Sequence, residues 1–334
     1  MVMNDDLLPN IKNGNYIPIE QGDLVLADAS EDYSGIAEPC VILHEPKKKI
    51  IAGLHTIAIR PINTNHLYLY YLLHTKEFKK FGSFVGTGLK VFGITFNNFA
   101  KYETKMPMLP EQTSIGNFFR TMDNTIALYK RQAQNLKQLK KAYLQQMFPQ
   151  ERECVPKVRF KGFKGDWEQC KLGELSEITT GKLDANAMVN DGEFDFYTSG
   201  IKKYKIDKPA FNGPAITVAG NGATVGYMHL ADGQFNAYQR TYVLTKFKAN
   251  RCFLFSEIGN KLPRKITEEA RTGNIPYIVM DMLADLIIQV PKKTEEQILI
   301  GNFFYNLDTQ LSIQVQKIDR LRQLKSAYLQ KMFV

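Results

Sequence analysis

Residues 111–148 read EQTSIGNFFRTMDNTIALYKRQAQNLKQLKKAYLQQMF, and residues 296–333 read EQILIGNFFYNLDTQLSIQVQKIDRLRQLKSAYLQKMF. The two stretches align without gaps, and about half of their positions are identical. Every residue of the second stretch lies 185 positions after its partner in the first, as Gly301 follows Gly116. Because self-similarity of this length reflects repeated structural units, we expect two related halves in this chain.

Each copy is predicted to form one long helix. Neither contains an internal proline, and apolar residues recur at alternating intervals of four and three, which indicates a heptad seam. A helix of about 38 residues extends roughly 57 Å at about 1.5 Å per residue. The predicted helix–helix seam consists of Ile115, Phe119, Met122, Ile126, Tyr129, Leu136, Tyr143, Ile300, Phe304, Leu307, Leu311, Ile318, Leu321 and Tyr328. Polar residues also fall on the seam, at Lys140, Gln314 and Lys325, where they lower stability but can fix register. Two ordinary amphipathic core helices are the alternative.

The composition favours a two-domain protein with an anionic partner. A chain of 334 residues has room for two domains plus helices, and its net charge of +9 favours polyanions, nucleic acid first. The four cysteines form no CxxC pair, which fits a reduced cytosol and argues against structural zinc. The first residues, MVMNDDLLPN, do not resemble a signal peptide, and no apolar run reaches the roughly 18 residues of a membrane span. We therefore expect a cytoplasmic protein.

The predicted fold class is α+β, with two related α/β globules joined and separated by two long antiparallel coiled-coil helices. The predicted segments are the first globule at 1–107, the first long helix at 108–150, a linker with the second globule at 151–291, and the second long helix at 292–334. Inside the globules we expect a helix at 66–81, a strand–turn–strand at 215–229, a single strand at 236–247, and a helix at 252–262 followed by basic residues. The repeat extends weakly into the globules, since 52–59 aligns with 237–244. Residues 165–182 open the second globule without a counterpart, so the first globule is predicted to lack its opening element.

Several motifs together resemble the specificity subunit of type I restriction–modification systems. They are the duplicated EQ-x3-GNFF-x3-D signature at 111–123 and 296–308, the duplicated LKxAYLQxMF ending, the stretch at 155–175, and AGNGATVGY at 219–227. The resemblance implies two target-recognition domains that each read one half of a split double-stranded DNA target, with the paired helices setting the distance between the halves. It also implies docking to two DNA-adenine methyltransferase subunits, and through them to restriction subunits. S-adenosylmethionine, ATP and Mg are then expected on the partner subunits and no cofactor on this chain. The shortened first globule leaves open self-association or completion by a partner half-subunit.

The chemistry of the side chains indicates which residues are candidates for DNA binding. Lysine clusters suit phosphates, whereas guanidinium, amide and imidazole groups can read base edges. In the first half they are Lys47, Lys48, Lys49, His55, Lys90, Asn97 and Asn98. In the second half they are Lys202, Lys203, Tyr204, Lys205, Asn221, Gln239, Arg240, Lys265, Arg271 and Asn274. The alternative for each lysine cluster is an ordinary solvated surface.

No complete catalytic motif occurs in the sequence. The glycines of AGNGATVG do not have G-x-G-x-x-G spacing, and there is no P-loop. The stretch Asn274–Tyr277 resembles the Asn/Asp-Pro-Pro-Tyr/Phe loop of adenine methyltransferases, but Ile275 replaces the first proline. The five histidines lack metal-ligand spacing, and Glu-x-Lys triplets occur without the Pro-Asp that precedes them in nuclease cores. We therefore expect a non-catalytic DNA reader and scaffold without a metal site. The alternatives are a coiled-coil oligomerisation protein without a DNA role, and a methyltransferase or nuclease.

Overall fold

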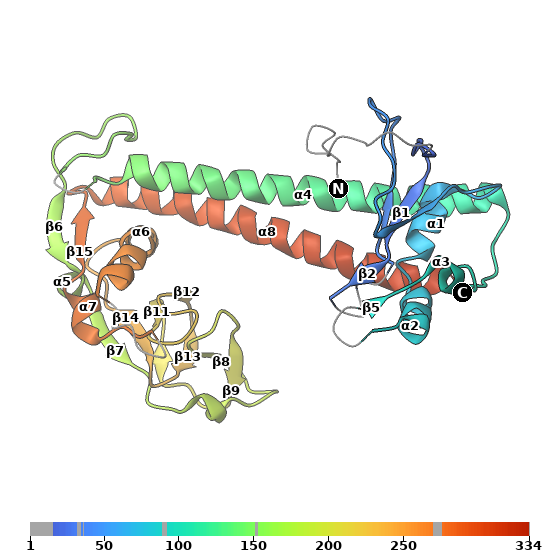
Figure 1. Ribbon diagram of the computed structural model, residues 1–334. Coiled ribbons are helices and arrows are strands. Elements are labelled where there is room, and N and C mark those ends of the chain that lie inside the picture. The colour runs from blue at the N-terminus through green and yellow to red at the C-terminus, as the bar shows by residue number, and fades with distance from the viewer. Residues whose placement is uncertain are drawn as a thin grey trace. The chain divides into compact units, whose positions relative to one another are not determined.

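The computed structural model describes residues 16–31, 35, 37–88, 92–150, 153–269 and 276–333 (Figure 1). The chain divides into two compact units, of which the first contains Met1–Gln132 and Gln314–Val334 and the second contains Ala133–Ile313. The predicted long helices are confirmed as α4 (Leu109–Met147) and α8 (Thr294–Met332), each of 39 residues. Each unit therefore contains the first part of one long helix and the last part of the other. Among the described helices, none is long and apolar enough to cross a membrane.

The globule of the first unit is built on a three-stranded antiparallel sheet in the order β3–β1–β4. Alternate residues of β1 are buried, as expected for a strand with one face on the core. The elements of this globule are β1 (Leu24–Ala27), β2 (Ala29–Ser30), β3 (Pro39–Val41), β4 (Thr56–Ile59), α1 (His66–Leu72), α2 (Lys76–Val85), β5 (Phe92–Gly93) and α3 (Phe96–Phe99).

The helix predicted at 66–81 is in fact two helices, α1 and α2. The side chain of Thr75 donates to the carbonyl oxygen of Leu72 and accepts from the amide of Phe78. Thr75 thus closes α1 and caps the first turn of α2, because a hydroxyl at the N-cap satisfies an amide that has no partner inside the helix. Apolar periodicity alone did not reveal this break.

The globule of the second unit contains two four-stranded sheets. One has the order β12–β11–β14–β7 and is antiparallel throughout, and the other has the order β10–β13–β8–β9 with β13 and β8 parallel. A separate antiparallel pair joins β15 to β6. The elements are β6 (Glu168–Lys171), α5 (Leu172–Leu175), β7 (Glu177–Thr180), a 3-10 turn (Ala185–Ala187), β8 (Phe194–Tyr197), β9 (Tyr204–Ile206), β10 (Phe211–Asn212), β11 (Ala215–Ala219), β12 (Met228–Ala231), β13 (Gln234–Ala237), β14 (Thr241–Thr245), α6 (Arg251–Glu269), α7 (Met280–Ala284) and β15 (Ile287–Val290).

Two expectations for the second globule are corrected, while the strand–turn–strand at 215–229 is confirmed as β11 and β12. The single strand predicted at 236–247 is two strands in different sheets, β13 and β14. A turn separates them, in which the amide of Thr241 donates to the carbonyl oxygen of Tyr238. The basic residues 261–265 do not follow the helix but lie within α6, which continues to Glu269.

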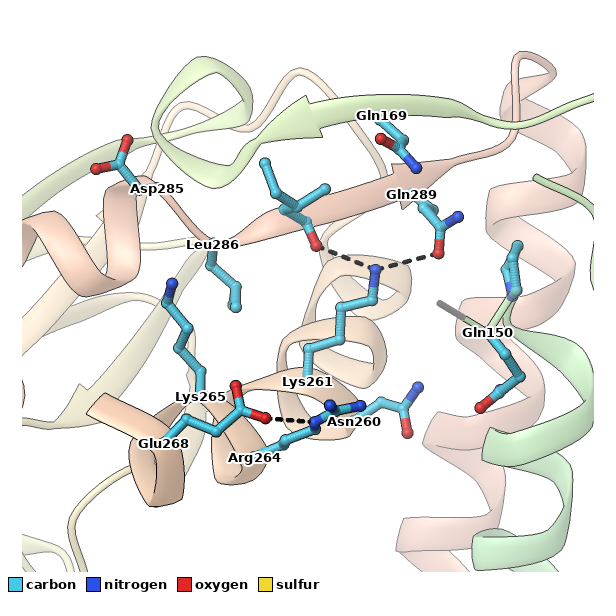
Figure 2. Close-up of a pocket in the computed structure, with 12 residues that line it drawn as sticks. Gln150, Gln169, Asn260, Lys261, Arg264, Lys265, Glu268, Asp285, Leu286 and Gln289 are labelled. Atoms are coloured by element: carbon cyan, nitrogen blue, oxygen red, sulfur yellow. Dashed lines mark hydrogen bonds and ion pairs between the residues drawn. The ribbon is translucent and has the colours of Figure 1, made fainter. Parts of the chain in front are cut away.

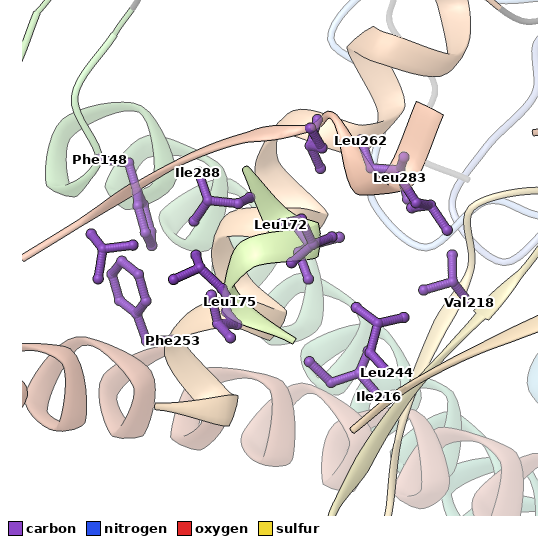
Figure 3. Packing of buried hydrophobic residues seen from close by; sticks show 14 of the residues in the cluster. Phe148, Leu172, Leu175, Ile216, Val218, Leu244, Phe253, Leu262, Leu283 and Ile288 are labelled. Carbon is purple, nitrogen blue, oxygen red and sulfur yellow. The ribbon is translucent and has the colours of Figure 1, made fainter. Parts of the chain in front are cut away.

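A large apolar core in the second unit joins its globule to the long helices (Figure 3). It combines residues of the long helices, such as Phe148 and Phe304, with Leu172 of α5, Ile216 of β11 and Phe253 of α6. All five of these residues are 0% exposed. At roughly 1.5–3 kcal/mol per fully buried large apolar side chain, this core fixes the long helices to their globule.

The repeat predicted from the sequence extends into the three-dimensional fold. The sheet β3–β1–β4 of the first unit has the same order and antiparallel pairing as β12–β11–β14 of the second. Strand β14 begins 185 residues after β4, and α6 begins 185 residues after α1. In the second unit β7 pairs with β14, but no described strand of the first unit pairs with β4 at the corresponding edge. The described part of the first globule therefore contains no strand equivalent to β7.

Candidate nucleic-acid interface

The glycine of each GNFF motif allows a globule to approach its long helix closely. A Cβ atom on Gly116 would lie 2.8 Å from Cβ of Leu67 and 2.9 Å from the amide nitrogen of Tyr68. A Cβ atom on Gly301 would lie 2.7 Å from the amide nitrogen of Phe253. Because real Cβ atoms do not approach neighbours this closely, any larger residue would push α1 or α6 away from the long helix.

The glutamine of each motif fixes the same junction by hydrogen bonds. In the first unit, Oε1 of Gln112 accepts from the amide of Asn65 at 2.9 Å, and the Asn65 side chain caps α1. In the second unit, Oε1 of Gln297 accepts from the amide of Asn250, also at 2.9 Å. Oδ1 of Asn250 in turn accepts from the amide of Phe253 in the first turn of α6. The duplicated signature therefore encodes the joint between globule and helix.

The aspartate of each motif pairs with a seam lysine of the other long helix. Nζ of Lys325 lies 2.6 and 2.8 Å from the two carboxylate oxygens of Asp123 in the first unit. Nζ of Lys140 lies 2.6 and 2.7 Å from those of Asp308 in the second. Both pairs are partly buried, and each joins the later part of one helix to the earlier part of the other, as antiparallel packing requires. Each pair therefore fixes the register of the two helices in its unit, as expected for polar seam positions. Between them the part of the seam around Gln314 has no such pair, and Oε1 of Gln314 is buried without a hydrogen bond.

The other predicted seam residues are buried or half-buried, except Tyr328, which is 41% exposed. Their contacts differ along the helix. Ile115 and Phe119 pack against α1 of the first globule, and Ile300 and Phe304 pack in the core with Phe253 of α6. In each unit the first turns of one long helix therefore contact the globule and also the last turns of the other long helix, as the ring pairs Phe118–Tyr328 and Tyr143–Phe303 show.

Five loops of the second unit meet at one end of its sheets, and main-chain hydrogen bonds join four of them. The amide of Gly220 donates to the carbonyl oxygen of Arg240, and the amide of Ile278 donates to that of Gly220. The amide of Gln239 donates to the carbonyl oxygen of Leu183 at 2.8 Å. The fifth loop joins through side chains, since the hydroxyl of Ser199 donates to Oδ1 of Asn221 and the hydroxyl of Thr224 donates to the Ser199 carbonyl oxygen. We call these loops (181–184, 198–203, 220–227, 238–240 and 276–278) the loop cluster.

Most of the candidates predicted in the second half lie on or beside the loop cluster. Gln239 and Arg240 occupy the β13–β14 turn with exposed side chains. Asn221 is half-buried, and its side-chain oxygen accepts from the hydroxyl of Ser199. Guanidinium and amide groups at one end of a rigid sheet have the donor chemistry for reading base edges.

Lysines border the loop cluster on the side of β9. Lys202, Lys203 and Lys205 are exposed, and Asp195 binds the last two, at 3.3 and 3.0 Å. Burial raises the pKa of Asp195, but the hydrogen bond from Lys205 and the charge of Lys203 outweigh it and hold that pKa below its usual range. Lys202 instead lies over the ring of Tyr204, 5.3 Å from its centre. One carboxylate among three lysines leaves this edge positive, as phosphate contact requires.

His229 lies under this edge and was not predicted. It contacts the rings of Tyr197 and Tyr227, and burial lowers its pKa below the ordinary value for histidine. Lys182 and Tyr227 also expose their side chains on the loop cluster. No sequence pattern distinguished these three residues, since only the folded chain brings their loops to one place.

The candidates of the first unit are more scattered. Lys47, Lys48 and Lys49 lie exposed in the loop between β3 and β4. His55 is exposed just before β4, with Nδ1 3.6 Å from a carboxylate oxygen of Asp28. Asn97 is exposed on α3, whereas the side-chain Nδ2 of Asn98 donates to the carbonyl oxygen of Val85 and supports the fold. Lys90 of the first half, and Arg271 and Asn274 of the second, lie outside the described residues.

Lys265 lies apart from the loop cluster, in a pocket of about 510 Å³ between α6 and β15 (Figure 2). The basic side chains of this pocket are occupied. Nζ of Lys261 lies 2.9 Å from a carboxylate oxygen of the fully buried Glu257, and it donates to Ile287 and Gln289. Arg264 and Lys265 pair with glutamates one turn along the same helix. Among the described residues, no group of three or more His, Cys, Asp or Glu side chains is placed to hold a metal ion.

The family comparison agrees with this architecture. The family model described as "Type I restriction modification DNA specificity domain" matches residues 12–138 and 164–323. The chain belongs to this family. The two matched stretches correspond to the two repeated halves, and each includes one copy of the EQ-x3-GNFF signature.

Individual relatives carry the same description. The chain is 35% identical over 165 residues to the specificity subunit of the type I restriction enzyme EcoDI of Escherichia coli, a match over 49% of this chain and 36% of the relative. It is 23% identical over 360 residues to the MjaVIII specificity subunit of Methanocaldococcus jannaschii, over 94% of this chain and 79% of the relative. A crystal structure of a type I S subunit from M. genitalium shares the fold with a TM-score of 0.72 at 14% identity, over 100% of this chain and 92% of that one.

Proposed function

We propose that this specificity-family chain reads a bipartite double-stranded DNA target, one part with each unit. The observation that carries the proposal is the repetition of the whole globule–helix joint, including its glycine, glutamine and Asp–Lys contacts, within a family named for DNA specificity. A chain built as two equivalent readers matches a target in two parts. The resemblance further assigns the spacing of these parts to the long helices.

In the second unit, the loop cluster is the proposed reading surface. Arg240 and Gln239 supply fork and amide donors for base edges, while Lys202, Lys203 and Lys205 follow the phosphates. The net charge of +9 supports attraction to DNA over the whole chain. In the first unit the lysines at 47–49 and His55 have the corresponding chemistry.

The chain itself is proposed to be non-catalytic and to act as a scaffold in the cytoplasm. It would bind two DNA-adenine methyltransferase subunits, and through them restriction subunits. S-adenosylmethionine, ATP and Mg would reside on those partners. The sequence supports this through the absence of a complete methyltransferase, nuclease or P-loop motif.

The experiment is selection of DNA sequences by the chain assembled with its methyltransferase subunit. A randomised duplex library should yield two short motifs at a fixed spacing. The double variant Q239A/R240A should relax one of the two motifs and leave the other intact, because these residues belong to one unit. Lys246→Ala is the matched control, since this exposed lysine lies at the end of β14 beyond the loop cluster and pairs with Glu177. Enrichment of no motif, or equal loss of both motifs in the double variant, would contradict the proposal.

A further inference from the structure

Strands β1 and β4 of the first unit pair in the same register as β11 and β14 of the second. Ala27 lies opposite Thr56 in the first unit, and Ala219 lies opposite Thr241 in the second. Thr241 also follows Thr56 by the 185 residues of the sequence repeat. The loops at these paired strand ends can therefore be compared residue by residue.

The main-chain hydrogen bonds between the loops are repeated as well. In the first unit the amide of Asp28 donates to the carbonyl oxygen of His55 at 3.3 Å, and the amide of Ile94 donates to that of Asp28 at 2.8 Å. The loop cluster contains the same two bonds around Gly220, with Arg240 in the place of His55. Strands β2 and β5 pair beside these bonds, where the loop cluster has an isolated antiparallel bridge. The first unit thus contains counterparts of three loops of the loop cluster, which we call the first-unit loops (28–30, 53–55 and 92–94).

The side chains at the centre of the first-unit loops differ from those of the loop cluster. The repeat places Leu54 at the position of Gln239 and His55 at the position of Arg240. Leu54 is 91% exposed. The side chain of His55 is 79% exposed, and its Nδ1 atom faces the carboxylate of Asp28. An exposed leucine therefore stands where the second unit has an amide.

The chemistry of leucine limits what this position can recognise on a base pair. Leucine has no hydrogen-bond donor or acceptor in its side chain, whereas the 5-methyl group of thymine is an apolar group in the major groove. Contact between the two removes apolar surface from water and favours binding. At a G·C pair the leucine would instead cover polar atoms, which would lose their hydrogen bonds to water. A leucine at this position can therefore discriminate thymine from bases without the methyl group.

We propose that the first-unit loops are the DNA-reading surface of the first unit, and that Leu54 recognises the 5-methyl group of a thymine. The inference rests on the proposed function, because it names the base chemistry that one of the two units reads. With Nδ1 of His55 turned to Asp28, the Nε2 atom on the far side of the ring can bond a neighbouring base edge. The carboxylate of Asp28 repels phosphates, so this surface suits base edges better than the sugar–phosphate backbone.

The test compares thymine with uracil, which lacks only the 5-methyl group. The chain assembled with its methyltransferase subunit is titrated with duplexes that carry the two selected motifs. The motif that Q239A/R240A leaves intact belongs to the first unit, and each of its thymines is replaced in turn by uracil. We expect one replacement to weaken binding by the parent assembly about fourfold, the factor that corresponds to burying one methyl-sized group. The variant Leu54→Ala should bind thymine and uracil equally at this position.

A matched control and a second variant accompany this measurement. Ile62 is 80% exposed in the segment after β4, beyond the other end of that strand, so Ile62→Ala should keep the full response to uracil. The variant Leu54→Gln introduces the amide that Gln239 carries in the second unit. Library selection with this variant should change the preferred base pair at the same position and leave the other motif unchanged.

The inference is wrong if no thymine of this motif responds to uracil, if Leu54→Ala keeps the full response, or if Leu54→Gln selects the parent motif. It is also wrong if Leu54→Ala weakens binding while uracil has no effect on the parent assembly, because the leucine then acts as a wedge between base pairs. These results would leave the proposed function standing. A selection without any enriched motif would contradict the proposed function and this inference together.

Discussion

The ion pair between Arg159 and Glu296 provides the sharpest test of the structure. Replacing Arg159 by alanine leaves a carboxylate that is 1% exposed without its bidentate partner. Removing one member of a buried pair typically costs about 3–5 kcal/mol. We expect the second unit of R159A to lose stability by about this amount.

The chain contains a convenient probe for this measurement. Its single tryptophan, Trp167, is buried in the core of the second unit, so its fluorescence reports the unfolding of that unit. With an m-value of about 2 kcal/mol per molar urea, the midpoint should fall by about 1.5–2.5 M. Adding Glu296→Gln to R159A should restore part of the loss, because the unpaired charge is then absent.

A matched change in the first unit serves as the control. Glu111→Gln alters the equivalent but exposed residue and should change stability by less than about 0.5 kcal/mol. A urea midpoint for R159A within about 0.3 M of the midpoint of the parent chain would refute the reasoning. At an m-value of about 2 kcal/mol per molar, such a shift corresponds to a loss in free energy of unfolding far smaller than the cost of a buried unpaired carboxylate.

Three further predictions follow from single contacts. Burial raises the pKa of Glu257 from 4.5 to about 7. This group therefore stabilises the fold at low pH and loses that contribution as the pH rises through about 7, which lowers the urea midpoint. Glu257→Gln should remove this contribution, so the urea midpoint should fall less between pH 5 and pH 8. Reversing the seam pair as Lys140→Asp with Asp308→Lys should restore most of the melting temperature that either single reversal loses, and equal melting of all three variants would show that the pair does not couple. Gly226→Ala should destabilise the second unit by more than about 1 kcal/mol, since φ is +81° and the new Cβ would lie 2.5 Å from Cδ1 of Ile266; an unchanged urea midpoint would contradict this.

The two long helices show which structural features apolar periodicity can predict. The alternating intervals of four and three between apolar residues identified both long helices, because residues on the buried face of a helix recur every three or four positions. The same pattern assigned Ile115 and Phe119 to the helix–helix seam, and in the structure both lie in one cluster with α1 and with residues at the end of the second long helix. Periodicity shows that a helix face is buried, but it does not show which partner covers it.

The points inside the globules where a predicted helix or strand divides into two depend on local hydrogen bonds, which apolar periodicity does not detect. Thr75 ends one helix and starts another, and the turn at Tyr238 sends the chain from one sheet into the next. Among the candidate DNA-binding residues, side-chain chemistry selected Gln239 and Arg240, which lie on the loop cluster, and also Lys265, which is paired within a separate pocket. Chemical type was visible in the sequence, and spatial grouping was not.

The sequence by itself determined the repeat, the two long helices and the family, because each follows from the order and spacing of residues along the chain. Only the tertiary structure decided which loops meet at the loop cluster. It also decided that Glu296 is buried against Arg159 while Glu111 is exposed. Two identical residues in matching sequence contexts differ in this way because burial depends on segments that are distant along the chain, and those segments come together only when it folds.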